Sequence, residues 1–513
     1  MSTRDDDRLS EGFARWSLVL APLLALAFAH FVDLKPGAPL VTRTAAVAIV
    51  MAIWWISGAL PLAATSLLPV VLFPFLGIMS AKDVSQQYLT DTTFLFMGGF
   101  LVALAMERWE LHRRISLWMM MGFGVRPRML LLGFLAPTFF ITMWISNSAT
   151  TMMMLPIATS IIASLEHQLE PRVLRRYAAG LYLGVAYSAS IGGAATLIGT
   201  PTNLTFRRML GVVFEHAPEV SFSQWFLFSF PTSILLEIVL WGVLCVMACP
   251  RGMEAVIDPN TIREQYRRLG PMGYAQKILL AAFAAMALLW FTREGFDFGA
   301  VKIPGWAMLF EQPKFITDGT VAMLVAVGLF LIPARDGGGG HLLDWEVARR
   351  LPWDIVLLFG GGFALAQGFV DSGLSKWFGE ELALAGHLPP IVVVLIVAAT
   401  VCFLSELTSN VATAEMVLPI LAALAVAIKV HPFLLMIPAT LAASYAFMLP
   451  AGTPPNAIAY ATGRIKMREM IGAGFILNWA GIVIVTLITA TLGRSVFGVD
   501  LLQLPEWAVL KGH

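Results

Sequence analysis

The chain has 513 residues, of which 58% are apolar and 13% are charged, and its formal net charge is +1. Soluble domains carry about 25% charged residues, so this composition excludes an ordinary soluble globular protein. The sequence has no basic tract of the kind that binds nucleic acid. Its apolar runs are continuous over about 20 residues, which predicts membrane-spanning helices rather than the alternating segments of a β-barrel.

Residues 1–78 contain about three apolar runs and have no counterpart later in the chain, so we expect N-terminal scaffold helices there. Arg4, Arg8 and Arg15 precede the first run, as in a signal peptide. The acidic residues 5–7 and the lack of a small-residue cleavage site favour an uncleaved first span instead.

Residues 79–250 are predicted to form a first repeat, which contains an interrupted apolar segment at 129–165. Pro137 and Pro156 lie on either side of a polar step at 146–148, and basic residues lie at both ends of the segment. This pattern indicates two short helices that meet at a polar tip and enter and leave the membrane on the same side. Irregular backbone at that depth requires a cavity lined by protein or filled with water, so the tip is expected to face one.

A Gly-Thr-Pro step at 199–201 interrupts the apolar stretch 177–213. Proline lacks a backbone donor and breaks a helix, so we expect a new half-helix to begin from Asn203. Its free amide groups would then point towards the centre of the bilayer.

The same motifs return in the second half of the chain. Residues 144–150 match 407–413, and residues 95–100 match 358–363, in both cases 263 residues later. The Gly-Thr-Pro step returns at 452–454, 253 residues later. Three matched blocks in the same order predict an internal repeat, and breaks within apolar helices are typical of transporters with a binding site at mid-membrane.

The repeat sets the remaining boundaries. We expect a connecting segment with helices and cytoplasmic loops at 251–352. A second repeat follows at 353–493 and contains a second re-entrant hairpin at 389–430. Residues 494–513 are then a C-terminal tail.

The basic residues orient the spans. Of the 34 Lys and Arg residues, 22 fall in six islands that we place on the cytoplasmic side, in keeping with the positive-inside rule. This predicts a cytoplasmic N-terminus, an outward-facing C-terminus and a multi-pass location in the plasma (inner) membrane. The expected fold is an all-α polytopic membrane protein with two inverted repeats, broken helices, two re-entrant hairpins and about 11 transmembrane helices.

The two predicted tips carry hydroxyl and amide groups, from Ser146, Asn147 and Ser148 in the first and from Ser409 and Asn410 in the second. Helix N-termini favour anions, whereas hydroxyls and freed carbonyls favour a hard cation such as Na⁺. Neither motif contains Lys, Arg or His, so a bound cation would balance the anion. Small polar residues also serve close helix packing, but the duplication of both motifs in register favours a binding site.

Glu406 breaks the symmetry, because Met143 lies at the equivalent position of the first half. A carboxylate within a membrane segment is a candidate functional group. Two roles remain open at this point: a proton-sensitive coupling group, or a structural acceptor for hairpin backbone amides, which we favour.

At these residues the chain resembles the divalent anion/sodium symporter family, known in animals as solute carrier family 13. The paired tips at 146–148 and 409–411, and the stretch from Ala443 to Ile458, carry the resemblance over about residues 40–493. It implies a homodimer whose protomers each have a scaffold part and a transport part that moves like an elevator.

The resemblance also implies ligands. Sodium site 1 would take Thr142, Ser146, Asn147 and Gly199, and sodium site 2 would take Ser405, Thr408, Asn410 and Gly452. The residues implied for substrate binding are Ser146, Asn147, Ser148, Thr200, Ser409, Asn410, Val411 and Thr453. Ser148 and Val411 replace threonines of the family pattern, and Val411 lacks the hydroxyl, which puts succinate specificity in doubt.

The sequence therefore favours a secondary active transporter that couples Na⁺ to uptake of C4-dicarboxylates such as succinate, malate or fumarate. The alternatives are an exchanger without net sodium coupling and a sodium-coupled citrate or sulfate carrier. Hairpins that end at mid-membrane argue against a channel. The sequence shows no nucleophile with a matching base, so we expect no enzyme and no catalytic residue. We expect no cofactor besides the coupling ion Na⁺, and as partners a di- or tricarboxylate anion, the lipid bilayer and a second copy of the chain, without nucleic acid.

Overall fold

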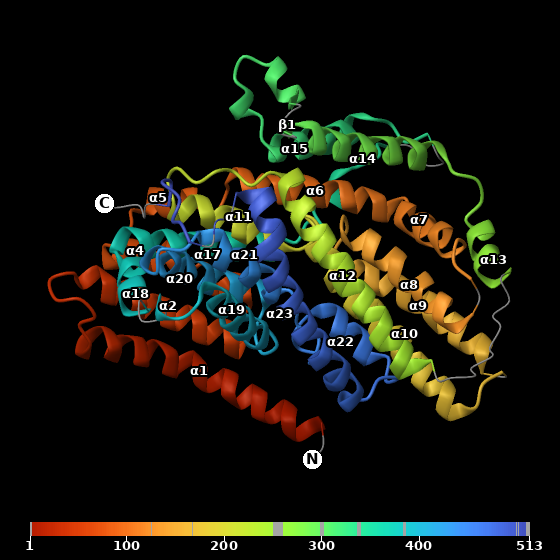
Figure 1. Cartoon of the computed structure of the whole chain (residues 1–513), viewed down its shortest axis with the longest axis horizontal. Coiled ribbons are helices and arrows are strands. Elements are labelled where there is room, and N and C mark those ends of the chain that lie inside the picture. The colour runs from red at the N-terminus through yellow and green to blue at the C-terminus, as the bar shows by residue number, and fades with distance from the viewer. Residues whose placement is uncertain are drawn as a thin grey trace.

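A computed structural model describes residues 3–124, 126–166, 168–249, 260–297, 302–335, 340–382, 386–498, 500 and 502–508. The predicted boundary at residue 251 and the last residues of the predicted tail lie outside these ranges. The described part is built from helices (Figure 1). Its two short strands, β1 (Gly295–Asp297) and β2 (Lys302–Pro304), pair antiparallel with Gly295 opposite Pro304.

The helices that precede the first predicted hairpin are α1 (Thr3–Phe31), α2 (Pro39–Ser57), α3 (Leu62–Thr65), α4 (Leu68–Leu76), α5 (Ala81–Gln86), α6 (Asp91–Arg108) and α7 (Leu111–Met120). The rest of the first half contains α8 (Pro127–Thr142), α9 (Asn147–Leu165), α10 (Pro171–Ala194), α11 (Pro201–Val213) and α12 (Phe222–Ala248).

The connecting segment contains α13 (Asn260–Arg268), α14 (Tyr274–Thr292), the 3₁₀ turns η1 (Trp306–Leu309) and η2 (Pro313–Phe315), α15 (Asp318–Leu331) and α16 (Trp345–Ala348). The second half contains α17 (Trp353–Ser372), α18 (Leu374–Leu382), α19 (Pro390–Ser405), α20 (Asn410–Ala427), α21 (Pro432–Ala443), α22 (Pro454–Ala461) and α23 (Met467–Phe497).

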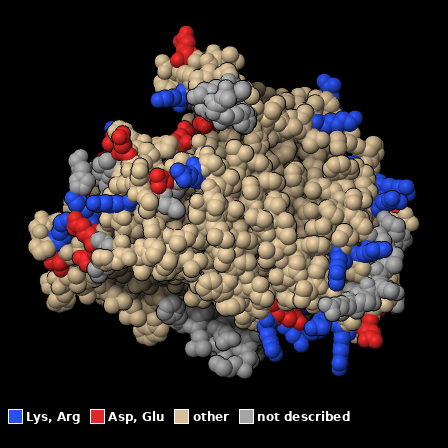
Figure 2. All heavy atoms as spheres, in the orientation of Figure 1, with Lys and Arg blue, Asp and Glu red and all other residues tan. Residues whose placement is uncertain are grey.

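The chain is a multi-pass helical membrane protein. Nine helices in the described ranges are long and apolar enough to cross a bilayer, and five shorter apolar helices accompany them. On the face shown in Figure 2, charged side chains gather at the margins and leave a broad central area without them. The expected fold class is thus confirmed, while the count of about 11 spans and the inversion of the repeats remain predictions.

Both predicted hairpins consist of two helices in contact. α8 ends at Thr142 and α9 begins at Asn147, and α19 and α20 are separated by an equally short polar turn. Ser146 ends the first turn because its hydroxyl accepts a hydrogen bond from the Ala149 amide at 3.2 Å, which caps α9. The interruptions thus lie at the polar tips that the sequence indicated.

Both predicted helix breaks are also present. Irregular backbone separates α10 from α11 and α21 from α22, and a proline opens each second helix, where its missing N–H costs no hydrogen bond. The two halves interlock at these breaks, because α11 packs against α20 and α21, while α22 packs against α9 and α10 (Figure 1). Each half-helix thus lies on the hairpin of the other half.

Candidate functional site

The tips and the breaks surround one cavity of about 640 Å³. Its remaining wall comes from the segment that joins α2 to α3 and from the start of α17. The predicted site residues that line the cavity are Ser146, Asn147, Ser148, Gly199, Thr200, Thr408, Ser409, Asn410, Val411, Gly452 and Thr453. Two predicted residues, Thr142 and Ser405, are fully buried behind this lining.

Four helices begin at the cavity. Their N-cap residues are Ser146 for α9, Thr200 for α11, Ser409 for α20 and Thr453 for α22. Only Ser146 among these four caps its own helix through its side chain. A helix N-terminus carries about half a positive charge and unpaired amide groups, so four of them make this cavity suited to an anion.

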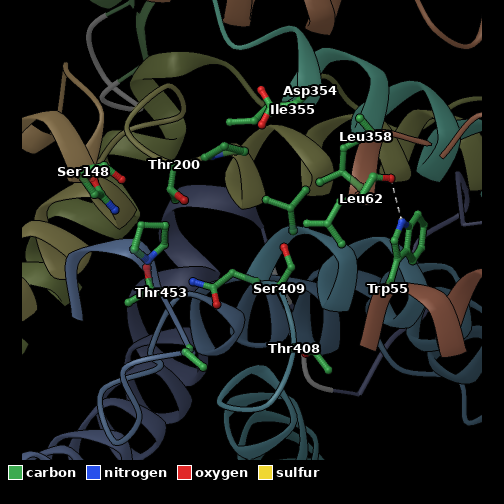
Figure 3. A pocket seen from close by; sticks show the side chains of 18 of the residues that line it. Trp55, Leu62, Ser148, Thr200, Asp354, Ile355, Leu358, Thr408, Ser409 and Thr453 are labelled. Atoms are coloured by element: carbon green, nitrogen blue, oxygen red, sulfur yellow. Dashed lines mark hydrogen bonds between the residues drawn. The ribbon is translucent and has the colours of Figure 1, made fainter. Parts of the chain in front are cut away.

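The cavity has one polar and one apolar side. In Figure 3, Ser148, Thr200 and Thr453 lie on one side of the view and Ser409 lies near its centre. The opposite side is formed by apolar residues that include Trp55, Leu62 and Leu358, while Ile355 lies beside Asp354 between the two sides. The indole of Trp55 is fixed by a hydrogen bond of 3.3 Å to the Leu62 carbonyl.

The lining residues include one charged group, Asp354, and no Lys, Arg or His. Among the described residues that line the cavity, a bound carboxylate would therefore accept hydrogen bonds from hydroxyls, side-chain amides and helix N-termini. No group of three or more His, Cys, Asp or Glu side chains that could hold a metal ion occurs in the described ranges.

Behind the first tip, several oxygen atoms lie close together. The side-chain oxygen of Asn147 is buried and has no hydrogen-bond partner in the described structure. It packs closely against Gly193, since a Cβ atom added to this glycine would lie only 2.5 Å from the oxygen. The carbonyl oxygens of Gly193 and Thr142 both lie close to Gly199. A Cβ atom added to Gly199 would overlap the Gly193 oxygen and lie 2.9 Å from the Thr142 oxygen. The Thr142 hydroxyl, in contrast, donates within its own helix to the Thr138 carbonyl at 2.9 Å.

A similar group of polar atoms lies behind the second tip. The Ser405 hydroxyl donates to the Ala443 carbonyl at 2.6 Å. The side-chain amide of Asn410, oriented with its nitrogen towards this group, donates to Ser405 Oγ at 2.8 Å, to the Ala443 carbonyl at 3.2 Å and to the Gly452 carbonyl at 3.1 Å. The Thr408 hydroxyl does not bond to this group of atoms. It donates to the Leu404 carbonyl at 3.0 Å and contacts the Thr413 hydroxyl.

The third residue after each Gly-Thr pair holds a break in shape, a role that sequence reasoning missed. Asn203 donates to the Thr196 carbonyl at 2.7 Å, and Asn456 donates to the Ala446 and Leu449 carbonyls at 2.8 and 3.0 Å. Both asparagines are fully buried. Their presence in the two copies of the repeated Gly-Thr-Pro-x-Asn motif was a signal that could have identified them.

The two breaks are also joined to each other. Thr202 and Ser444 lie within hydrogen-bonding distance, 2.7 Å between their hydroxyl oxygens. Because Thr202 belongs to α11 and Ser444 follows α21, this contact joins the polar centres of the two halves directly.

Glu406 has a structural role, but not with the predicted partners. Its carboxylate accepts from the Met448 and Leu449 amides at 2.8 and 3.0 Å and from the Asn478 side chain at 2.7 Å. These two amides belong to the break between α21 and α22, so the expectation of hairpin amides is wrong. The break needs this acceptor because its amides have no helical partners.

Broken helices around a polar cavity inside a helical membrane protein are the architecture of a secondary transporter. The comparisons with known proteins agree with this class. Residues 14–499 match the family described as the sodium:sulfate symporter transmembrane region, and the chain belongs to this family.

Two relatives are named for sodium-dependent transport of dicarboxylates. The chain is 42% identical over 464 residues to a sodium-dependent dicarboxylate transporter of Staphylococcus saprophyticus, a match that covers 89% of this chain and 87% of the relative. It is 40% identical over 495 residues to the transporter of the same name in Staphylococcus aureus, with 95% and 92% covered.

Two solved structures share the fold at low identity. The YdaH transporter of Alcanivorax borkumensis superposes with a TM-score of 0.56 at 12% identity, covering 88% of this chain and 98% of that one. MtrF of Neisseria gonorrhoeae gives a TM-score of 0.55 at 12% identity, with 92% and 98% covered. At this identity the likeness concerns the fold alone.

Proposed function

We propose that this protein is a secondary active transporter that couples Na⁺ to the movement of C4-dicarboxylates. The observation that carries the proposal is the meeting of four helix N-termini at one cavity without a basic side chain. The relatives at 40–42% identity, named for sodium-dependent dicarboxylate transport, support the same substrate and ion.

The anion would lie against both tips, with its carboxylates near Ser146, Asn147 and Ser148 on one side and near Ser409 and Asn410 on the other. Thr200 and Thr453 would add hydroxyls. Neither caps its own helix, and the Thr200 hydroxyl lies 3.1 Å from that of Thr202. Val411 presents an apolar surface at the second tip. The two carboxylates of one substrate would therefore be held by unequal sets of donors.

Sodium would be carried behind the tips. The unpaired Asn147 oxygen, together with the Gly193 and Thr142 carbonyls, fits a hard cation. Behind the second tip, turning the Asn410 amide would bring its oxygen next to Ser405 Oγ and the Ala443 and Gly452 carbonyls, which are also oxygen ligands. The hydroxyls of Thr142 and Thr408 contribute less than their sequence positions imply, since both are used within the hairpins.

Uptake of labelled succinate into proteoliposomes tests this function. We expect uptake with an inward sodium gradient and none when lithium, potassium or choline replaces sodium. Uptake that requires internal dicarboxylate and not sodium would identify an exchanger instead. Competition by citrate and by sulfate measures which anion is preferred.

The arrangement in the membrane is part of the proposal. We place the protein in the plasma membrane as a homodimer with its N-terminus in the cytoplasm and its C-terminus outside, divided at residues 79, 251, 353 and 494, with an elevator-like transport part. The excess of Lys and Arg in the six predicted cytoplasmic islands supports this orientation.

Labelling of introduced cysteines tests the inversion of the repeats. With Ser148→Cys and Val411→Cys, we expect modification from opposite sides of the membrane and protection by substrate with sodium. Labelling of both positions from one side only, in every condition, contradicts the proposed topology.

A further inference from the structure

A second buried carboxylate lies in the second hairpin, away from the cavity. Glu415 is on α20, is 1% exposed, and is the one charged residue of that helix. Neither of its carboxylate oxygens has a hydrogen-bond partner among the described residues. It thus differs from Glu406, whose oxygens accept three hydrogen bonds.

The carboxyl group is enclosed by the glycines of α17. A Cβ atom at Gly362 would overlap the Glu415 carboxyl, and Cβ atoms at Gly360 and Gly361 would overlap Tyr88 and Ser66. Three successive glycines therefore let α20, Tyr88 and Ser66 approach the backbone of α17 directly. Such close packing leaves no room between Gly362 and Glu415 for a water molecule or a metal ion.

Among the described residues, no basic group pairs with the Glu415 carboxyl. Tyr88 and Glu415 pack against the nearby glycines Gly360 and Gly362 of α17, but the Tyr88 hydroxyl donates to the Ser66 carbonyl at 2.6 Å. On α11, Arg207 pairs with acidic residues, Glu219 among them, and Arg208 donates to the Gln87 side chain at 2.8 Å.

The other helices packed against α20 add no buried charge. α19 and α21 contain no charged residue. The charged side chains of α2, α17 and α18 are exposed, namely Arg43, Asp354, Asp371, Lys376, Glu380 and Glu381.

An ionised carboxylate in such surroundings is strongly disfavoured, and the group takes up a proton instead. We propose that Glu415 is a proton-binding site, protonated while α20 is seated against α17 and ionised when the second hairpin moves away. The proton comes from water and returns to water, so the step is a simple carboxylate protonation. The movement of the hairpin rests on the transport function proposed above. The presence of the bound proton does not.

The proton site belongs to one hairpin only. The equivalent position of the first hairpin is Met152, which is 57% exposed. Glu415 therefore gives the second hairpin a proton site that the equivalent position of the first hairpin lacks.

Infrared spectroscopy of the purified protein with isotope-labelled glutamate tests the bound proton without any need for transport. We expect a carboxylic-acid band at about pH 7, where a solvated glutamate is ionised, and its loss in Glu415→Gln. The matched control is Glu237→Gln, which removes another buried glutamate, on α12. One of its carboxylate oxygens accepts from the Ser188 hydroxyl at 2.6 Å and the other has no partner among the described residues, so the control removes any acid band of its own. The control must keep the component that Glu415→Gln loses.

Two outcomes overturn the proposal: no acid band in the wild type, or an acid band that Glu415→Gln leaves intact. If Glu415→Gln does not fold, the Glu237→Gln protein decides. An acid band that persists there, and also in the Glu237→Gln/Glu406→Gln double variant, supports Glu415, and its absence contradicts the proposal.

The pH dependence of succinate uptake tests the movement. Between about pH 7 and about pH 9 the substrate is fully ionised, and we expect wild-type uptake to fall while Glu415→Gln, which mimics the neutral acid, stays nearly flat. Equal profiles contradict a role in transport. If neither protein takes up succinate, the proposed function fails while the infrared result still decides on the proton site.

Discussion

At one pair of equivalent positions, the two halves of the molecule support their helix breaks with different chemical groups. In the first half, the Thr196 hydroxyl donates to the Met143 carbonyl at 2.5 Å. In the second half, the Leu449 amide donates to the Glu406 carboxylate at 3.0 Å. Met143 matches Glu406 and Thr196 matches Leu449 in the sequence repeat, so the same pair of positions is in contact in both halves. In the first half a side chain donates to the backbone, whereas in the second half the backbone donates to a side chain.

This difference separates two kinds of symmetry. At the tips the residue types repeat, with Ser146-Asn147 in one half and Ser409-Asn410 in the other, because their side chains line a shared cavity. At the pair Met143–Thr196 and Glu406–Leu449 only the contact repeats, because any donor and acceptor of suitable geometry can satisfy the backbone of a break. Repeated residue types that line the cavity therefore indicate binding, whereas buried ones such as Asn203 and Asn456 indicate support.

The largest effect is expected at the tips. Asn147→Ala and Asn410→Ala should each lower sodium-driven uptake by at least about two decades, because each removes an amide that contacts both proposed ligands and each unmade hydrogen bond costs roughly 1–3 kcal/mol. Size-exclusion chromatography should show an unchanged folded protein. Uptake close to wild type from either variant would remove the tips from the site.

The next effect concerns the support of the second break. Glu406→Ala leaves three donors without an acceptor, and each should cost roughly 1–3 kcal/mol of stability, measured by thermal unfolding in detergent. The matched change in the first half, Met143→Leu, keeps the carbonyl that accepts from Thr196 and should cost under about 1.5 kcal/mol. Equal losses from the two changes would contradict the assignment of side-chain support to one half and backbone support to the other.

A smaller loss is expected from Thr196→Val. This change leaves the Met143 carbonyl and the Gly199 amide without their shared partner, a cost of roughly 1–3 kcal/mol and less than that of Glu406→Ala. Thr491→Val is a suitable control, because Thr491 is exposed and bonds only within its own helix. A control that loses as much stability as Thr196→Val would show that the break is not what the variant measures.

The smallest effect concerns substrate preference. Val411→Thr restores a hydroxyl to the second tip and should raise affinity for C4-dicarboxylates by up to about one decade, whereas Ser148→Ala should lower it by a similar amount. Competition of labelled succinate by succinate, citrate, tartrate and sulfate measures both changes. An unchanged order and unchanged affinities in Val411→Thr would mean that this position does not contact substrate.

Much of the site could be predicted from sequence, because helix breakers and polar tips are local signals. Pro201 and Pro454 determine where helices begin, and the duplicated tips indicated which residues would line the cavity. The hydrogen bonds of Glu406 could not be predicted, because a carboxylate that satisfies amides some 42 positions further along the chain depends on packing that no local pattern encodes. Glu415, a carboxylate within the predicted hairpin, was a signal that sequence reasoning missed, but its enclosure could not be predicted because it depends on how α20 meets the glycines of α17.

The interlocking of the halves has a consequence for biosynthesis. Because α22 completes the wall beside α9 and α11 completes the wall beside α20, neither half encloses a cavity alone. The first hairpin must therefore wait in the bilayer, with its polar tip unmatched, until residues 454–461 have been synthesised. Contacts of such long sequence separation form late and slowly, so a ribosome that stalls just before residue 454 leaves most of the chain synthesised but without a complete site.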